Sequence, residues 1–401
     1  MARAIGTISL AVALLGCGRT GSLPPAAVAT RAGTEELREL LDTLRRAAGA
    51  PGAILGVLTK DGRLQLVTSG YADKETQRPI ASADPYFLGS ITKTYTAVTV
   101  LRLVEQGRLS LDDSLTRWFP SFPGGSKITV RHLLAQTSGL KDFYVYLYLR
   151  PNRAEMIEFV TKRWTEQELL VLSARFGSYF EPGAGWDYSS TNYYLLGVIA
   201  ERVTGLSIQN AYRRYVFEPL GIRRTWLHGR EEPRGAVPVG YMGKVAGWKH
   251  SEMFGELGAT TVLDRSSVEL SAGGLIAPAE EALRFLHELL AGKLLSRASL
   301  DLMLQFRPTR PLGVSDSSTV SPDRSDGYGL GLVRMELPGV TLLGHGGLYN
   351  GHTAGLWYLA DQGVTVALYV NRGFIDQRGI LHRLLPEIIR EAARRHPARG
   401  G

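Results

Sequence analysis

The sequence predicts a mixed α/β (α+β) fold, in which one antiparallel sheet flanked by N- and C-terminal helices carries an inserted helical lobe. Strand–turn–strand patterns near both ends of the 401-residue chain, with helical patterns between them, indicate this class. At 44% hydrophobic and 21% charged residues, the chain has the composition of an ordinary globular protein. It is long enough to bury a substantial core.

The first element of the expected domain is a helix that opens at Thr34. Its leucines recur at helical spacing, and basic residues lie in its last turn, where they suit the helix dipole. Asp61-Gly62 then separates two β-type runs, 53–59 and 63–69. Because Asp-Gly favours the tight turn of a hairpin, we expect these two runs to pair.

The C-terminal part carries two further hairpin patterns and a last amphipathic helix. The expected elements are strands 328–335 and 340–344 around Pro338-Gly339, strands 353–359 and 364–370 around 361–363, and a helix at about 379–395. The two ends of the chain therefore build one sheet lobe, from about 34–84 and 325–395. Residues 85–324 form the helical lobe, and 396–401 are a tail. Together, residues 34–395 are one domain.

Ser90 and Lys93 are the most informative residues of the chain. They lie one helical turn apart at the start of an apolar run whose members recur at three- and four-residue intervals: Ile91, Tyr95, Val98, Leu101 and Val104. We expect this run to pack inward as one stripe while the hydroxyl and the amine share another face. A serine becomes a strong nucleophile when a neighbour removes its proton, and a lysine can do so if burial lowers its pKa. Ser-x-x-Lys is nevertheless a weak motif by itself, and a polar helix start is the alternative.

Two later segments strengthen the interpretation. Tyr188 lies in a polar cluster between a Pro/Gly turn and an apolar run, and His345 ends a β-type run just before the glycines 346 and 347. Each alone would be read as structural, Tyr188 as a turn aromatic and His345 as a strand-end histidine. The order Ser90, Tyr188, His345, with intervals of 98 and 157 residues, makes the functional reading the better one.

These motifs resemble those of the serine β-lactamase and penicillin-binding-protein superfamily, and most of all its class C β-lactamase-related group. That group contains D-Ala-D-Ala carboxypeptidases, D-aminopeptidases and family VIII carboxylesterases. Its motifs are Ser-x-x-Lys, Tyr-x-Asn and Lys-Thr-Gly or His-x-Gly, in this order. Linking segments are similar as well, and the resemblance covers about residues 34 to 395; these segments are 128–140, 218–221, 272–275 and 328–331.

The resemblance implies an acyl-enzyme mechanism without a cofactor or a metal. Ser90 would attack the carbonyl, while Lys93 and Tyr188 would move the proton to the leaving group. The backbone N–H groups of Ser90 and Leu348 would hold the oxyanion, and the substrate would lie along His345, Gly346, Gly347 and Ser190. Tyr188 could act as a base only if positive neighbours, Lys93 or His345, lowered its pKa.

One position departs from the family pattern. Ser190 stands where Tyr-x-Asn has its asparagine, and Asn192 lies two residues further on. A hydroxyl is shorter than a carboxamide and offers one donor, so contacts to a substrate amide are in question. The departure weakens a β-lactamase reading more than a hydrolase reading.

Other side chains are expected to be structural. His132 and His352 have no ligand partners at metal spacing, and no Gly-x-Ser-x-Gly elbow surrounds Ser90. The aromatic segment 143–149 is expected to pack in the core, although it could border the substrate cleft and favour apolar acyl groups. No phosphate loop or dinucleotide fingerprint is present, which argues against nucleotide cofactors.

The first residues predict export. Arg3, the apolar run 4–15 and Gly16-Cys17 read as a secretory signal with a bacterial lipobox, and Cys17 is the only cysteine of the chain. Residues 1–17 would be the signal peptide, a lipid on Cys17 would hold the protein to the membrane at its periplasmic or extracellular face, and 18–33 would be a flexible tether. An ordinary cleaved signal is the alternative.

The formal net charge is +8, and much of it comes from arginines near the C-terminus. This basic helix could meet anionic lipid, although such faces are usually just solvated. We expect no nucleic-acid partner, and we expect a monomer. The sequence thus predicts a serine hydrolase acting on a D-amino-acid peptide or β-lactam. Alternatives are a carboxylesterase or D-aminopeptidase of the same fold, and a cell-wall-binding protein without turnover.

Overall fold

The computed structural model describes residues 31–143, 158–159, 162–242, 259–260, 266–309, 326–349, 351–373, 375 and 377–394. Its centre is an antiparallel sheet of eight strands, in the order β3-β2-β1-β13-β12-β11-β10-β9. The strands are β1 Gly52–Leu58, β2 Leu64–Asp73, β3 Arg78–Pro79, β9 Gly327–Tyr328, β10 Val333–Leu337, β11 Val340–Tyr349, β12 His352–Leu359 and β13 Val364–Val370. The two ends of the chain meet where β1 pairs with β13. The mixed α/β class predicted from the sequence is confirmed.

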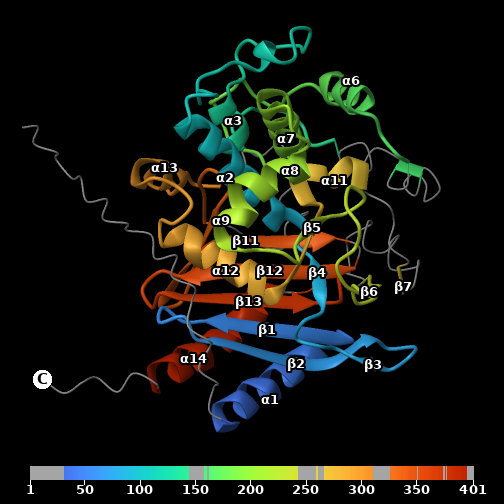
Figure 1. Cartoon of the computed structure of the whole chain (residues 1–401), viewed down its shortest axis with the longest axis vertical. Helices are drawn as coiled ribbons and strands as arrows, with labels where there is room; N and C mark the ends of the chain where they lie inside the picture. Colours follow the sequence, from blue (N-terminus) through green and yellow to red (C-terminus); the bar gives the residue numbers. More distant parts are fainter. Residues whose placement is uncertain are drawn as a thin grey trace, which may run out of the picture.

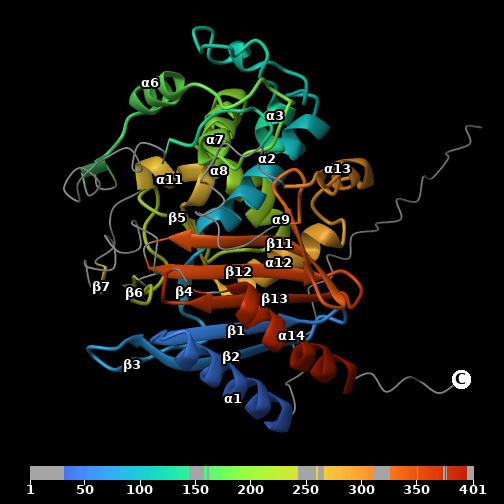
Figure 2. The ribbon, with the colours of Figure 1, turned by 180° about the vertical axis from the view of Figure 1, so that it is seen from behind.

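Helices cover both faces of this sheet. On one face lie α1 (Arg31–Ala47) and α14 (Gln377–Arg394), and on the other lies α12 (Ala279–Leu290), as the two opposite views show (Figure 1, Figure 2). Strand β13 is buried along its whole length because alternate residues face opposite layers. Leu368 packs with the α1 and α14 side, while Ala367 and Tyr369 join the core on the α12 side.

The hairpin predictions had mixed outcomes. The pairs β1–β2 and β12–β13 form as expected, and β10 pairs with β11 across the expected turn at Pro338-Gly339. The single strand expected over 328–335 is wrong, because the chain turns back on itself and Tyr328 of β9 pairs with Val333 of β10. Gly331 occupies the left-handed region at φ 82° in this turn, a conformation that glycine adopts without strain. The break places Tyr328 beside the site described below.

The helical lobe lies on the side of β11 that faces away from β12 (Figure 1). Its described helices are η1 Gly89–Ile91, α2 Thr92–Glu105, η2 Leu115–Arg117, α3 Val130–Leu134, α6 Glu166–Phe176, α7 Ser190–Thr204, α8 Ile208–Tyr212, η3 Arg213–Phe217, α9 Glu218–Leu220, α11 Ser266–Gly273 and α13 Arg297–Met303. Between 85 and 324, the chain also forms small sheets and provides α12, which packs on one face of the main sheet. The short strands are β4 Pro85–Phe87, β5 Trp226–Leu227, β6 Gly240–Tyr241, β7 Ala259–Thr260 and β8 Leu275–Pro278.

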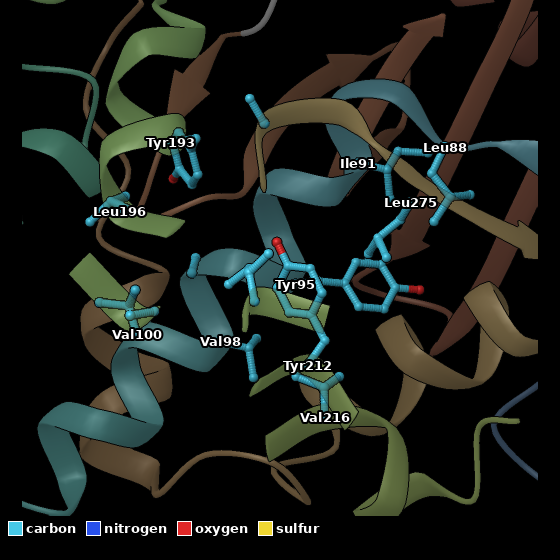
Figure 3. Packing of buried hydrophobic residues seen from close by; sticks show 14 of the residues in the cluster. Leu88, Ile91, Tyr95, Val98, Val100, Tyr193, Leu196, Tyr212, Val216 and Leu275 are labelled. Atoms are coloured by element: carbon cyan, nitrogen blue, oxygen red, sulfur yellow. The ribbon is translucent and has the colours of Figure 1, made fainter. Parts of the chain in front are cut away.

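Helix α2 is the centre of the lobe. Figure 3 shows Tyr95, Val98 and Val100 packed among side chains from α7, α8, η3 and β8. The expected stripe packs inward, with Ile91, Tyr95, Val98 and Leu101 buried, but burial is not confined to it, because α2 is buried on nearly all sides from Thr92 to Leu101. A helix surrounded by others holds the residues at its N-terminus in fixed positions, which is what a reactive site needs.

Two further features concern the chain ends. The first helix begins at Arg31, inside the segment expected as a tether, and the last helix covers the range expected for it. Within the described residues, no helix is both long and apolar enough to cross a membrane. Cys17 and the expected signal peptide lie outside the described residues, as do residues 144–149 of the aromatic segment. Its first residue, Phe143, is buried as expected.

Candidate active site

The structure brings Ser90 and Lys93 into contact at the start of α2. The Lys93 amine donates a hydrogen bond of 3.0 Å to the Ser90 hydroxyl and one of 2.8 Å to the carbonyl of Ala272. Ser90 is only partly covered, whereas Lys93 is fully buried. The nucleophile is therefore accessible while its neighbour is shielded from water.

Burial makes Lys93 a base. It lowers the pKa of the amine from 10.5 to about 8, although the carboxylates of Glu269 and Asp142 oppose the shift. At neutral pH this increases the neutral fraction of the amine roughly 300-fold over that of an exposed lysine. A neutral amine 3.0 Å from a hydroxyl can accept its proton. The expected chemistry of the pair is therefore available in this environment.

Tyr188 lies just before α7 and is close to Lys93. The Lys93 amine is 4.9 Å from the centre of the Tyr188 ring. The phenol oxygen is buried, and among the described residues no partner meets hydrogen-bond geometry with it. Burial raises the pKa of Tyr188 well above 10, the nearby Tyr328 raises it further, and Ser90 opposes the rise only in part. Tyr188 therefore carries its proton and is placed to pass one on, not to act as the initial base.

His345 comes from strand β11 and faces the same space. Its ring centre is 6.1 Å from that of Tyr188 and 6.0 Å from that of Tyr328. Burial, aided by the charge of Lys93, lowers the pKa of His345 to about 3, so the imidazole is neutral. A neutral imidazole supplies no positive charge, so His345 does not meet the condition under which it would lower the pKa of Tyr188. Its Nδ1 donates to the carbonyl of Gly346 at 2.6 Å, which leaves Nε2 as an acceptor.

Two backbone N–H groups meet beside Ser90. Strand β11 pairs with β12 as far as Tyr349, which lies opposite His352, and η1 packs against β11. A Cβ on Gly89 would lie 2.6 Å from the Leu348 nitrogen, and one on Gly347 would lie 3.1 Å from the Ser90 nitrogen and 1.9 Å from the Leu88 oxygen. Glycine at both positions lets the two segments touch. The N–H groups of Ser90 and Leu348, which are the expected oxyanion donors, therefore lie close together.

Ser190 joins the site, but Asn192 does not. Lys93 donates a long hydrogen bond of 3.4 Å to the Ser190 hydroxyl. The carboxamide of Asn192 is fully buried between Ser138 and Gln136, with hydrogen bonds to both side chains. It therefore cannot replace the missing asparagine of the Tyr-x-Asn motif. In the site, Ser190 offers a hydroxyl where the family pattern has a carboxamide.

Four residues near the site were not singled out from the sequence. The carbonyl of Ala272 accepts a hydrogen bond from the Lys93 amine. The carboxylates of Glu269 and Asp142 raise the pKa of that amine and so oppose the effect of burial. Gln136 hydrogen-bonds the segment around Tyr188. The linking segments 128–140 and 272–275 contain Gln136 and Ala272, whereas Glu269 and Asp142 had no sequence signal. The histidines expected to be structural are so: His132 caps α3 through Thr129, and His352 contacts the carbonyl of Pro238.

A serine hydroxyl 3.0 Å from a buried lysine amine, beside the backbone N–H groups of Ser90 and Leu348, is an arrangement suited to a serine hydrolase. The chain belongs to the Beta-lactamase family, whose family model matches residues 37–385. It is accordingly a serine hydrolase of that family.

Similar proteins cover several activities. Penicillin-binding protein 4* of Bacillus subtilis is 27% identical over 347 residues, 84% of this chain and 72% of that protein. Esterase EstB of Burkholderia gladioli is 34% identical over 227 residues, 54% of this chain and 56% of that protein. The D-amino acid amidase of Ochrobactrum anthropi SV3, complexed with L-phenylalanine amide, matches with a TM-score of 0.72 and 28% identity, covering 92% of this chain and all of that one. An octameric penicillin-binding protein homologue from Pyrococcus abyssi, at 22% identity, shares the fold.

Proposed function

We propose that this serine hydrolase cleaves amide bonds of D-amino-acid peptides or amides, or of β-lactams, through an acyl-enzyme on Ser90. The observation that carries the proposal is the buried Lys93 amine, 3.0 Å from the Ser90 hydroxyl and with its pKa lowered to about 8. The D-amino-acid specificity is supported by the similarity to the D-amino acid amidase over nearly the whole chain.

The proposed reaction has two steps. Lys93 takes the proton of Ser90 as its oxygen attacks the carbonyl carbon, and the N–H groups of Ser90 and Leu348 hold the oxyanion. The proton then passes through the Tyr188 hydroxyl to the amide nitrogen, the C–N bond breaks, and the amine leaves. Water next attacks the ester carbon and gives a proton to Lys93 by the reverse route; the ester C–O bond then breaks, Lys93 returns the proton to the Ser90 oxygen, and the acid product leaves.

The first test is a substrate panel read by intact protein mass. Benzylpenicillin, a D-Ala-D-Ala peptide and D- and L-phenylalanine amides are incubated with wild type and with Ser90→Ala. We expect turnover or a covalent adduct in wild type, a preference for the D-configured compounds, and neither turnover nor adduct in the variant. Adducts that persist in Ser90→Ala would remove the assignment of the nucleophile. Equal rates for D and L amides would remove the proposed specificity.

The activity should rise with pH. Below a pH of about 8 Lys93 is mostly protonated and cannot take the proton of Ser90, and above it the amine is neutral. We therefore expect kcat/KM to increase through a midpoint near 8, measured with a substrate that has no group titrating between pH 6 and 10. A profile that is flat or falls over that range would show that Lys93 is not the base.

Ester cleavage is the second candidate function. It is favoured by Ser190, whose hydroxyl replaces the carboxamide that would bind a substrate amide, and by the similarity to an esterase. Comparing kcat/KM for matched ester and amide substrates separates the two candidates. The variant Ser190→Asn should shift the ratio toward the amide if this position sets the preference, and should leave it unchanged if it does not.

We further propose that the protein is exported and held to the bacterial membrane by a lipid on Cys17. The support is the lipobox-like sequence that ends at Cys17, the only cysteine of the chain. The variant Cys17→Ala is expected to leave the membrane fraction when the full chain is produced in a bacterial host. Unchanged fractionation would contradict lipidation. The expected monomer stays a prediction, which light scattering tests.

A further inference from the structure

Gln136 occupies an unusual backbone conformation at the end of α3. The helix closes with hydrogen bonds from Gln136 N to Leu133 O and from Thr137 N to His132 O, the pattern of a Schellman turn. Gln136 takes the left-handed position of that turn, with φ 60°. Glycine usually occupies this position because any side chain strains it. A glutamine is held here, and its side chain is fully buried.

The buried glutamine is tied to the segment that carries Tyr188. Its backbone oxygen accepts from the N–H of Asp187 at 3.1 Å, and its side-chain oxygen accepts from the N–H of Ser189, also at 3.1 Å. Tyr188 is thus flanked by two hydrogen bonds to one residue. Both donors precede the first residue of α7, so the helix itself gives them no carbonyl.

We propose that Gln136 is a positioning residue for the proton transfer by Tyr188, which it holds beside Lys93. The inference rests on the proposed function, in which the Tyr188 hydroxyl relays the proton. Glutamine stands at this strained left-handed position because a glycine could make the turn but could not supply the side-chain oxygen that accepts the hydrogen bond. The same oxygen also accepts from Asn192 in the first turn of α7, so the helix and the preceding segment are joined at one point.

A double-mutant cycle tests this inference. Gln136→Met removes the acceptor and keeps the length of the side chain, and it is expected to lower the rate of Ser90 acylation about tenfold or more, with little change in substrate KM. In the Tyr188→Phe background, where no hydroxyl is left to position, Gln136→Met should lower the rate less than about threefold further. Equal fold-losses in the two backgrounds would show that Gln136 does not act through Tyr188 and would overturn the proposal.

Gln136→Gly and Ser138→Ala separate positioning from stability. The glycine variant relieves the backbone strain but lacks the acceptor, so its acylation rate should fall as much as that of Gln136→Met; a wild-type rate would overturn the proposal. Ser138 donates to Asn192 at 2.6 Å in the same network, and it also accepts from the N–H of Leu140. Ser138→Ala is therefore expected to lower the melting temperature and leave the acylation rate unchanged, and a rate loss equal to that of Gln136→Met would also overturn it.

The same experiment distinguishes a failure of the proposed function from a failure of the positioning role of Gln136. If wild type is not acylated at Ser90 by any compound of the panel or by a fluorophosphonate, the proposed function fails and the positioning role fails with it. If wild type is acylated and Gln136→Met reacts at the wild-type rate, only the role of Gln136 is overturned.

Discussion

Replacing Lys93 by arginine is expected to lower the rate of acylation about a thousandfold. Arginine keeps the positive charge beside Ser90 but does not lose its proton in proteins, so it cannot accept the proton of the hydroxyl. The loss should appear in kcat/KM at every pH, and the rise near pH 8 should disappear. Stopped-flow acylation of the purified variant measures the rate.

The matched control is Lys127→Arg. Lys127 forms an exposed ion pair of 2.9 Å with Glu181, away from the reactive serine, and arginine can keep that pair. We expect the wild-type rate and the wild-type pH profile for this variant. If Lys93→Arg retained more than about a tenth of the wild-type rate, Lys93 would not be the base and another group would have to be found.

Gly347→Ala is expected to lower kcat/KM about a hundredfold or more. The new methyl group would lie 1.9 Å from the Leu88 oxygen and 3.1 Å from the Ser90 nitrogen, so β11 must move away from η1. This movement separates the N–H groups of Ser90 and Leu348, and losing one oxyanion donor costs about 10²- to 10³-fold in kcat. Steady-state kinetics with the best substrate of the panel measures the effect.

Gly339→Ala controls for general damage to the same strand pair. Gly339 has φ 77° in the turn between β10 and β11, with no atom within 4 Å of an added Cβ. An alanine there strains the backbone and should lower the melting temperature, but it leaves the serine surroundings intact. If Gly347→Ala and Gly339→Ala lost the same activity for the same fall in melting temperature, the close contact between β11 and η1 would not be needed for catalysis.

The sequence motifs predicted which residues meet in the site, but they did not predict the protonation states of those side chains. Ser90 and Lys93 share a helix start, and motif order pointed to Tyr188 and His345. The neutral state of His345 depends on its burial and on the nearby charge of Lys93, neither of which a pattern of residue types reveals. The raised pKa of Tyr188 likewise follows from its buried surroundings.

The fold was predictable to the extent that its signals are local. Asp61-Gly62 and the turn at 361–363 marked hairpins that form. The break between β9 and β10 was missed because residues 328–335 read as one apolar run, although Gly331 makes a turn there. The role of Gln136 was also invisible, since its partners lie more than 50 residues away in the sequence.

The most direct test of the account is the site and pH dependence of reaction with a fluorophosphonate, which modifies activated serines without requiring the natural substrate. Peptide mass spectrometry after labelling should find the phosphonyl group on Ser90, with a rate that rises through pH 8 in wild type and is at background in Lys93→Arg. Modification at another residue, or equal rates in wild type and Lys93→Arg, would contradict the central claim that a neutral Lys93 activates Ser90.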